Sequence, residues 1–75
     1  MTQAQEQKLQ KAFGKRLADI RKSRGVTQQQ LAEAVSMSVV AIAYLETGKR
    51  FARIGTLAKI AKTLKVDISE LFKGI

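Results

Sequence analysis

The sequence predicts an all-α fold in which five short helices form one compact domain. Apolar residues recur at intervals of three and four along most of the chain, which is the periodicity of amphipathic helices. Pro is absent, and the five Gly are spaced like stops between helices rather than like hairpin turns. A length of 75 residues suits a single small domain. We expect this domain over residues 8–75, preceded by a Gln-rich N-terminal extension at residues 1–7.

The composition is strongly basic and lacks the side chains of most enzyme sites. Lys and Arg number 14 against 6 Asp and Glu, which gives a formal net charge of +8. Since 45% of the residues are apolar, we expect a folded domain and not a disordered tail to carry this charge. There is no Cys and no His, so disulfides, the usual metal ligands and the usual nucleophile–base pairs are missing. We therefore expect no enzymatic activity, no metal site and no cofactor.

The first helix is predicted by a stripe of apolar residues that ends before Gly25. Its members are Leu9, Phe13, Leu17 and Ile20, which are four, four and three residues apart. Gly25 would supply the left-handed stop. The start falls between Thr2 and Lys8, because the Gln-rich lead-in is compatible with a helix but offers nothing apolar to bury.

The second and third helices are predicted from their capping residues. The sequence Thr27-Gln28-Gln29-Gln30 has the form of a capping box, and this helix is expected to end near Ser36-Met37. Ser38 is a suitable N-cap for a helix from Val39 to about Thr47, with Gly48 as its stop. Two short helices joined so tightly suggest a helix-turn-helix, although any small helical bundle shows similar apolar spacing. Its expected core is Leu31, Ala32, Val35, Met37, Ile42 and Leu45.

Two further helices complete the predicted domain. The fourth is expected from about Arg53 to Leu64, with Ile54, Leu57, Ala58, Ala61 and Leu64 facing inward. A second capping-box spacing, Asp67-Ile68-Ser69-Glu70, predicts a short fifth helix that Gly74 would end. The longest apolar run, Val39 to Ala43, is far shorter than a membrane span, and the N-terminus lacks the blocks of a signal peptide. We therefore expect a cytoplasmic protein with no membrane partner.

Several short motifs between Phe13 and Phe72 occur in a specific order. They are Gly14-Lys15-Arg16-Leu17, Ile20-Arg21-Lys22, Gly25-Val26-Thr27-Gln28, Leu31-Ala32, Ser38, Ile42, Leu45-Glu46-Thr47-Gly48-Lys49-Arg50, Leu57, Ile60-Ala61, Leu64 and Leu71-Phe72. In combination they resemble the Cro and phage-repressor-like helix-turn-helix proteins, also called the xenobiotic-response-element family. The resemblance implies a five-helix, lambda-repressor-like DNA-binding domain whose helices 2 and 3 form the helix-turn-helix. It also implies a sequence-specific transcriptional regulator that binds a palindromic operator in double-stranded DNA as a homodimer.

The same resemblance assigns roles to individual residues. The positions that match the base-reading face of the recognition helix are Val39, Val40, Ala43 and Tyr44. The positions expected near phosphate are Thr27, Gln28, Ser38, Thr47, Lys49, Arg50 and Arg53. Arg21 and Glu46 match a structural pair that joins the first helix to the end of the recognition helix.

The chain departs from the family pattern at the reading face and at two turns. Val39, Val40 and Ala43 cannot form the bidentate hydrogen bonds that distinguish base pairs. We therefore expect discrimination to depend on thymine methyl contacts, groove shape and half-site spacing. Ser36 stands where the family often has Gly in a left-handed conformation, so modest strain is expected there. The familiar Pro and Ser before the fourth helix are replaced by Ala52-Arg53.

Two further questions stay open from the sequence. The alternative function is an antitoxin or adaptor that binds a protein partner, such as a toxin or polymerase, through exposed apolar residues: Val39, Val40, Phe51 and Ile54. The resemblance also implies the surface that would join two copies, which here comprises Phe51, Ile54, Ile68, Phe72 and Ile75. Ile68 and Phe72 are equally expected in the core, because so short a chain needs its large side chains there.

Overall fold

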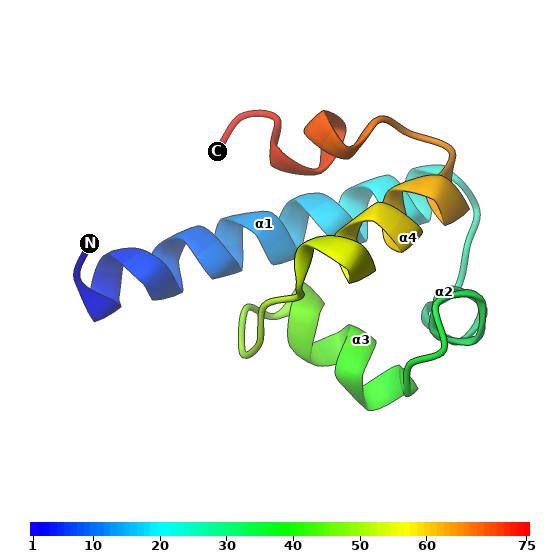
Figure 1. Cartoon of the computed structure of the whole chain (residues 1–75), viewed down its shortest axis with the longest axis horizontal. Coiled ribbons are helices and arrows are strands. Elements are labelled where there is room, and N and C mark those ends of the chain that lie inside the picture. The colour runs from blue at the N-terminus through cyan, green and yellow to red at the C-terminus, as the bar shows by residue number, and fades with distance from the viewer.

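Helix α1 (Gln3–Ser23) runs the length of the molecule, and both α3 and the C-terminal 3-10 helix pack on it (Figure 1). A computed structural model describes all residues, 1–75. The 21 residues of α1, at about 1.5 Å each, nearly span the 33 Å longest dimension. Its N-cap Thr2 forms a capping box with Gln5, so the helix starts inside the expected range. Most of the Gln-rich segment 1–7 is thus the first turn of α1.

The remaining helices are α2 (Gln28–Ala34), α3 (Val39–Glu46), α4 (Ile54–Leu64) and the 3-10 helix η1 (Ile68–Phe72). Helix α3 packs against α1 and α2, whereas η1 packs against α1 and α4. In Figure 1, α2 and α3 lie below α1 and η1 lies above it. The all-α class is confirmed, because the structure contains no strand.

The fifth helix is a 3-10 segment and not the capped α-helix that was expected. Asp67 accepts a hydrogen bond from the amide of Ser69, two residues on, at 2.9 Å. This bond lowers the pKa of the Asp67 carboxyl below its usual value of 3.8. Glu70 does not close the expected box, because its carboxylate pairs with Arg16 on α1 at 3.1 Å. Asp67 therefore still caps η1, and the ion pair with α1 replaces only the bond that Glu70 would have contributed to the box.

The predicted caps of α2 and α3 are confirmed. The amide of Gln30 donates to the Thr27 hydroxyl at 3.0 Å, and the amide of Thr27 donates to the Gln30 side chain at 2.9 Å. Ser38 caps α3 by accepting from the amide of Ala41 at 3.0 Å. Helix α2 ends at Ala34, slightly earlier than expected, because Ser36 is already left-handed with φ of 57°. The strain expected at Ser36 is therefore located in the turn between α2 and α3.

One core holds these elements together. Its buried apolar residues are Phe13, Leu17, Ile20, Leu31, Ala32, Val35, Ile42, Leu45, Leu57, Ile60, Ala61, Leu64 and Leu71. Met37 and Ile68 pack against it while partly buried. Three expected core positions are wrong, because Leu9 is 41% exposed, Ile54 is 72% exposed and Ala58 also faces solvent. Leu9 and Ile54 lie on turns that extend past the core, and Ala58 lies beside the buried stripe of α4.

Helices α1 and α3 approach each other at Gly14. A Cβ atom at this position would collide with the backbone carbonyl oxygens of Leu45 and Glu46. Only Gly therefore allows the C-terminal end of α3 to rest directly on α1, and this contact fixes how α3 is presented.

Candidate nucleic-acid interface

Helix α3 presents an exposed apolar face on one side of the molecule. Its buried side chains, Ile42 and Leu45, attach it to the core. On the opposite side, Val39 is 41% exposed, Val40 59% and Tyr44 40%. Ala43 lies on the same arc of the helix but is half-buried. The structure thus brings the four expected base-reading positions onto one surface, with Ala43 the least accessible.

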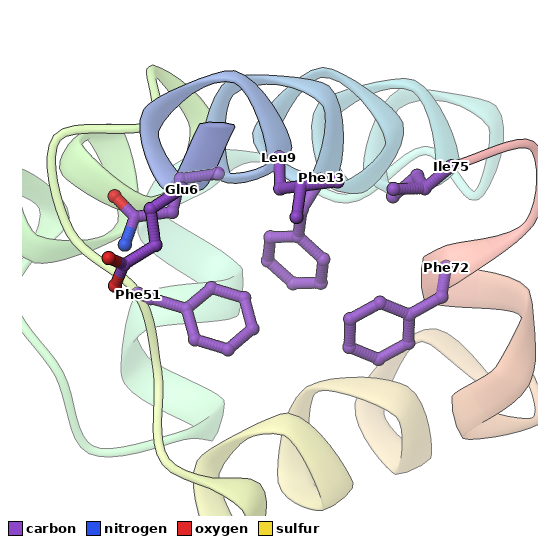
Figure 2. Close-up of a pocket in the computed structure, with 7 residues that line it drawn as sticks. Glu6, Leu9, Phe13, Phe51, Phe72 and Ile75 are labelled. Atoms are coloured by element: carbon purple, nitrogen blue, oxygen red, sulfur yellow. The ribbon is translucent and has the colours of Figure 1, made fainter. Parts of the chain in front are cut away.

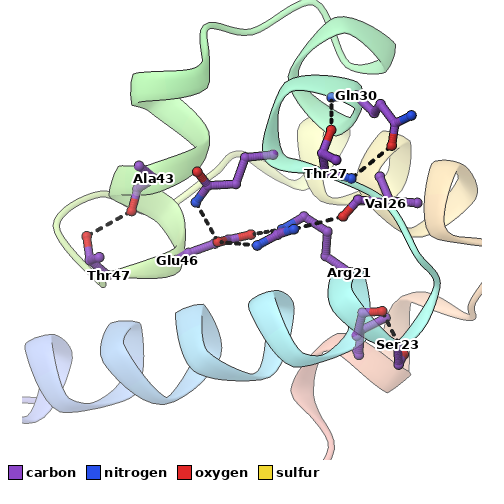
Figure 3. Close-up of polar contacts among 10 residues, drawn as sticks. Arg21, Ser23, Val26, Thr27, Gln30, Ala43, Glu46 and Thr47 are labelled. Atoms are coloured by element: carbon purple, nitrogen blue, oxygen red, sulfur yellow. Dashed lines mark hydrogen bonds and ion pairs between the residues drawn. The ribbon is translucent and has the colours of Figure 1, made fainter.

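An ion pair between Arg21 and Glu46 fixes the C-terminal end of α3 to α1 (Figure 3). The Arg21 Nε donates to Glu46 Oε2 at 2.6 Å, and Nη2 donates to Oε1 at 3.2 Å. The remaining guanidinium donor, Nη1, binds the carbonyl oxygen of Val26 at 2.8 Å, just before α2. Arg21 is only 7% exposed. One buried side chain therefore sets the positions of both α3 and the start of α2 relative to α1.

Gln28 belongs to this network, which sequence reasoning did not anticipate. Its Nε2 donates to Glu46 Oε1 at 2.8 Å, so the side chain is directed toward α3. The NH2 group carries a second N–H donor, so a phosphate contact by this nitrogen would not require the bond to Glu46 to break. No spacing rule in the sequence joins residues 28 and 46, because the contact arises only when α2 and α3 pack together.

Three exposed cations follow α3 in the chain: Lys49, Arg50 and Arg53. The backbone amides of Lys49 and Arg50 both donate to the carbonyl oxygen of Tyr44, at 2.9 and 3.2 Å, and turn the loop back toward α3. The Lys49 ammonium lies 5.6 Å from the centre of the Tyr44 ring, within cation–π range. The two ion pairs of the structure use Arg16 and Arg21, so these three cations are available to an anionic partner.

The hydroxyl groups expected near phosphate differ in what they can still donate. Those of Thr27 and Ser38 accept helix-capping bonds, which leaves each hydroxyl proton free. The Thr47 hydroxyl instead donates to the carbonyl oxygen of Ala43 at 2.9 Å (Figure 3). Thr27 and Ser38 can therefore donate to a phosphate oxygen, whereas Thr47 has already used its proton.

A second surface is an apolar pocket between α1, the α3–α4 loop and the C-terminus (Figure 2). Its volume is 320 Å³. The rings of Phe51 and Phe72 lie 5.1 and 5.2 Å from that of the buried Phe13. Leu9 and Ile75 complete the apolar lining, so this pocket gathers three of the five residues expected to join two copies. Ile68 instead packs on the core, and Ile54 lies outside the pocket.

The structure contains no group of three or more carboxylates that could hold a metal ion. None of its helices has the length and apolar character needed to cross a membrane.

Comparisons with known proteins agree with this architecture. Residues 17–71 match the family model described as helix-turn-helix. The HTH-type transcriptional activator BcrR of Enterococcus faecalis is 37% identical over 62 residues, covering 83% of this chain and 30% of the relative. The HTH-type transcriptional regulator PuuR of Escherichia coli (strain K12) is 38% identical over 61 residues, covering 81% and 33%. The chain thus spans about a third of the length of these curated relatives.

Two solved structures share the fold. The restriction-modification controller protein C.AhdI from Aeromonas hydrophila superposes with a TM-score of 0.84 at 27% identity, covering 88% of this chain and 96% of that one. The clp gene regulator ClgR from C. glutamicum gives a TM-score of 0.79 at 30% identity, covering 84% and 82%. Because a family model matches most of the chain, this protein belongs to the helix-turn-helix family of DNA-binding transcriptional regulators, which are not enzymes.

Proposed function

We propose that this chain is a sequence-specific DNA-binding regulator that places α3 in the major groove and binds a palindromic operator as a homodimer. The observation that carries the proposal is the exposed face of α3 next to three unpaired cations, Lys49, Arg50 and Arg53. The cations would contact phosphates and set the register of α3 on the duplex. The net charge of +8 would add long-range attraction to DNA.

The exposed side chains of α3 determine how such a protein would read sequence. Val39 and Val40 offer methyl groups, which can contact the C5-methyl of thymine but cannot hydrogen-bond to a base edge. The Tyr44 hydroxyl is the one side-chain hydrogen-bonding group on this face. Discrimination would therefore depend on thymine methyls, on groove shape and on half-site spacing.

The apolar pocket supports the proposed homodimer, which would also match the symmetry of a palindromic operator. Four of its lining residues are large, apolar and 39–46% exposed: Leu9, Phe51, Phe72 and Ile75. Contact between two such surfaces would remove apolar area from water and would relate the copies by a two-fold axis. A two-fold dimer presents one α3 to each half-site of a palindrome.

The proposal is tested by measuring DNA binding as a function of salt after a binding selection has supplied a duplex. The logarithm of the affinity should fall with the logarithm of salt concentration by about 0.9 per phosphate contact. Replacing Lys49 and Arg50 with Gln should reduce this slope by about 1.8, so that the affinity ratio to wild type changes about tenfold between 50 and 200 mM salt.

The control removes two exposed charges outside the helix-turn-helix, at Lys65, which ends α4, and at Lys73, which ends η1. Lys65 has φ of 58°, so Lys65→Asn is chosen because Asn tolerates a left-handed backbone. Together with Lys73→Gln it should leave the slope near that of wild type. Equal losses in both double variants, or DNA binding that does not respond to salt, would contradict the proposed interface. Absence of salt-dependent DNA binding would favour a protein-interaction module, because an apolar protein interface should barely respond to salt.

A further inference from the structure

A polar cleft lies beside the C-terminal end of α3, where the following loop meets the N-terminal half of α1. Six residues line it, none of them apolar: Gln7, Gln10, Lys11, Thr47, Gly48 and Lys49. Its volume is 390 Å³. In Figure 1 the loop after α3 lies next to α1. No residue of α1 in this cleft was among the expected DNA contacts.

The close approach of Gly48 to Lys11 sets the shape of the cleft. Gly48 is buried and left-handed, with φ of 77°. A Cβ at Gly48 would lie 2.7 Å from both Cα and Cγ of Lys11, so the loop backbone rests directly on α1. Lys11 is therefore held beside the loop that carries Lys49.

The chemistry of the cleft suits an anion. Its two Lys side chains are exposed, take part in neither ion pair of the structure, and no carboxylate is among the lining residues. The side-chain amides of Gln7 and Gln10 add neutral hydrogen-bond donors. Lys49 also lies over the Tyr44 ring, so the positive charge continues from the base-facing side of α3 into the cleft.

We propose that this cleft binds a phosphate of the DNA backbone next to the half-site read by α3, with Lys11 and Lys49 as its charged contacts. The proposal rests on the DNA-binding function above and extends the interface from the helix-turn-helix onto α1. Gln7 and Gln10 would orient the phosphate, since side-chain amides often contact backbone oxygens.

The test compares Lys11→Gln with wild type on the selected duplex, by salt titration and by phosphate-ethylation interference. Gln retains the Cγ atom that lies against Gly48 but removes the charge. The salt slope should fall by about 0.9, so the affinity ratio to wild type should change about threefold between 50 and 200 mM salt. One phosphate per half-site should lose its interference signal, and Lys11→Arg should retain both properties.

The matched control is Lys8→Gln, which removes the same charge one turn away on α1, outside the cleft. A second variant, Gln7→Glu, places a negative charge in the cleft at an exposed position and should weaken binding even if Lys11→Gln proves unstable. Identical slopes and interference patterns for wild type, Lys11→Gln and Gln7→Glu would overturn this inference alone. Absence of salt-dependent binding by wild type would overturn the proposed function as well.

Discussion

At the scale of single residues, Arg21 and Glu46 do the most to orient α3. Their side chains are 9% and 6% exposed, and the pair is completed by bonds from Arg21 to Val26 and from Gln28 to Glu46. Each guanidinium nitrogen of Arg21 and each carboxylate oxygen of Glu46 has a partner, and the structure has no buried polar side-chain atom without one. Removing one member of such a buried network lowers the stability of the domain, because the remaining members stay buried without partners.

Glu46→Ala should therefore destabilise the domain by about 3 kcal/mol, since it leaves the buried Arg21 charge uncompensated. The change is measured as the free energy of unfolding in urea. The double variant Arg21→Met with Glu46→Leu should recover much of this loss, because it removes both charges and keeps apolar volume. A loss below about 0.5 kcal/mol in Glu46→Ala would indicate that the pair contributes no more than a surface ion pair.

At the scale of elements, the crossing of α1 and α3 decides how the exposed face of α3 is presented. Gly14 lies within α1, where Gly is intrinsically unfavourable, and yet its missing side chain allows the contact with the end of α3. Gly55 lies within α4 and has nothing within 4 Å of the position of a Cβ. The two glycines therefore have opposite structural roles although both are helical.

Gly14→Ala and Gly55→Ala should change stability in opposite directions. Gly55→Ala should raise the free energy of unfolding by up to about 1 kcal/mol, because Ala has the higher helix propensity and the space is open. Gly14→Ala gains the same propensity but forces α3 away from α1, so it should lower stability by about 1–3 kcal/mol. Thermal unfolding of the two variants measures both effects, and a stabilised Gly14→Ala would show that the crossing is loose.

At the scale of the whole molecule, local patterns in the sequence predicted the helices better than the surfaces. The caps at Thr27 and Ser38 were predictable because they depend on residues within three positions. The exposure of Leu9 was not, since helical periodicity gives the direction of a side chain but not whether another element covers it, and for Ile54 the sequence supported both a buried and an exposed position. The residues expected to read bases share one short helix and could be proposed from a resemblance, whereas the Gln28–Glu46 bond requires the packed fold.

The apolar pocket is another surface that exists only in the packed fold. Leu9 comes from one end of the chain and Ile75 from the other, and no local pattern could bring them together.

Leu9 and Ile75 each contribute roughly 1 kcal/mol to a dimer if half of the side chain becomes buried, and each occurs twice in a symmetric dimer. Leu9→Ser with Ile75→Ser should therefore raise the dissociation constant of the dimer more than about tenfold, measured by sedimentation equilibrium. Ile54→Ser, equally apolar but outside the pocket, is the control. A dimer weakened by Ile54→Ser and unchanged by the other two would place the contact elsewhere on the molecule.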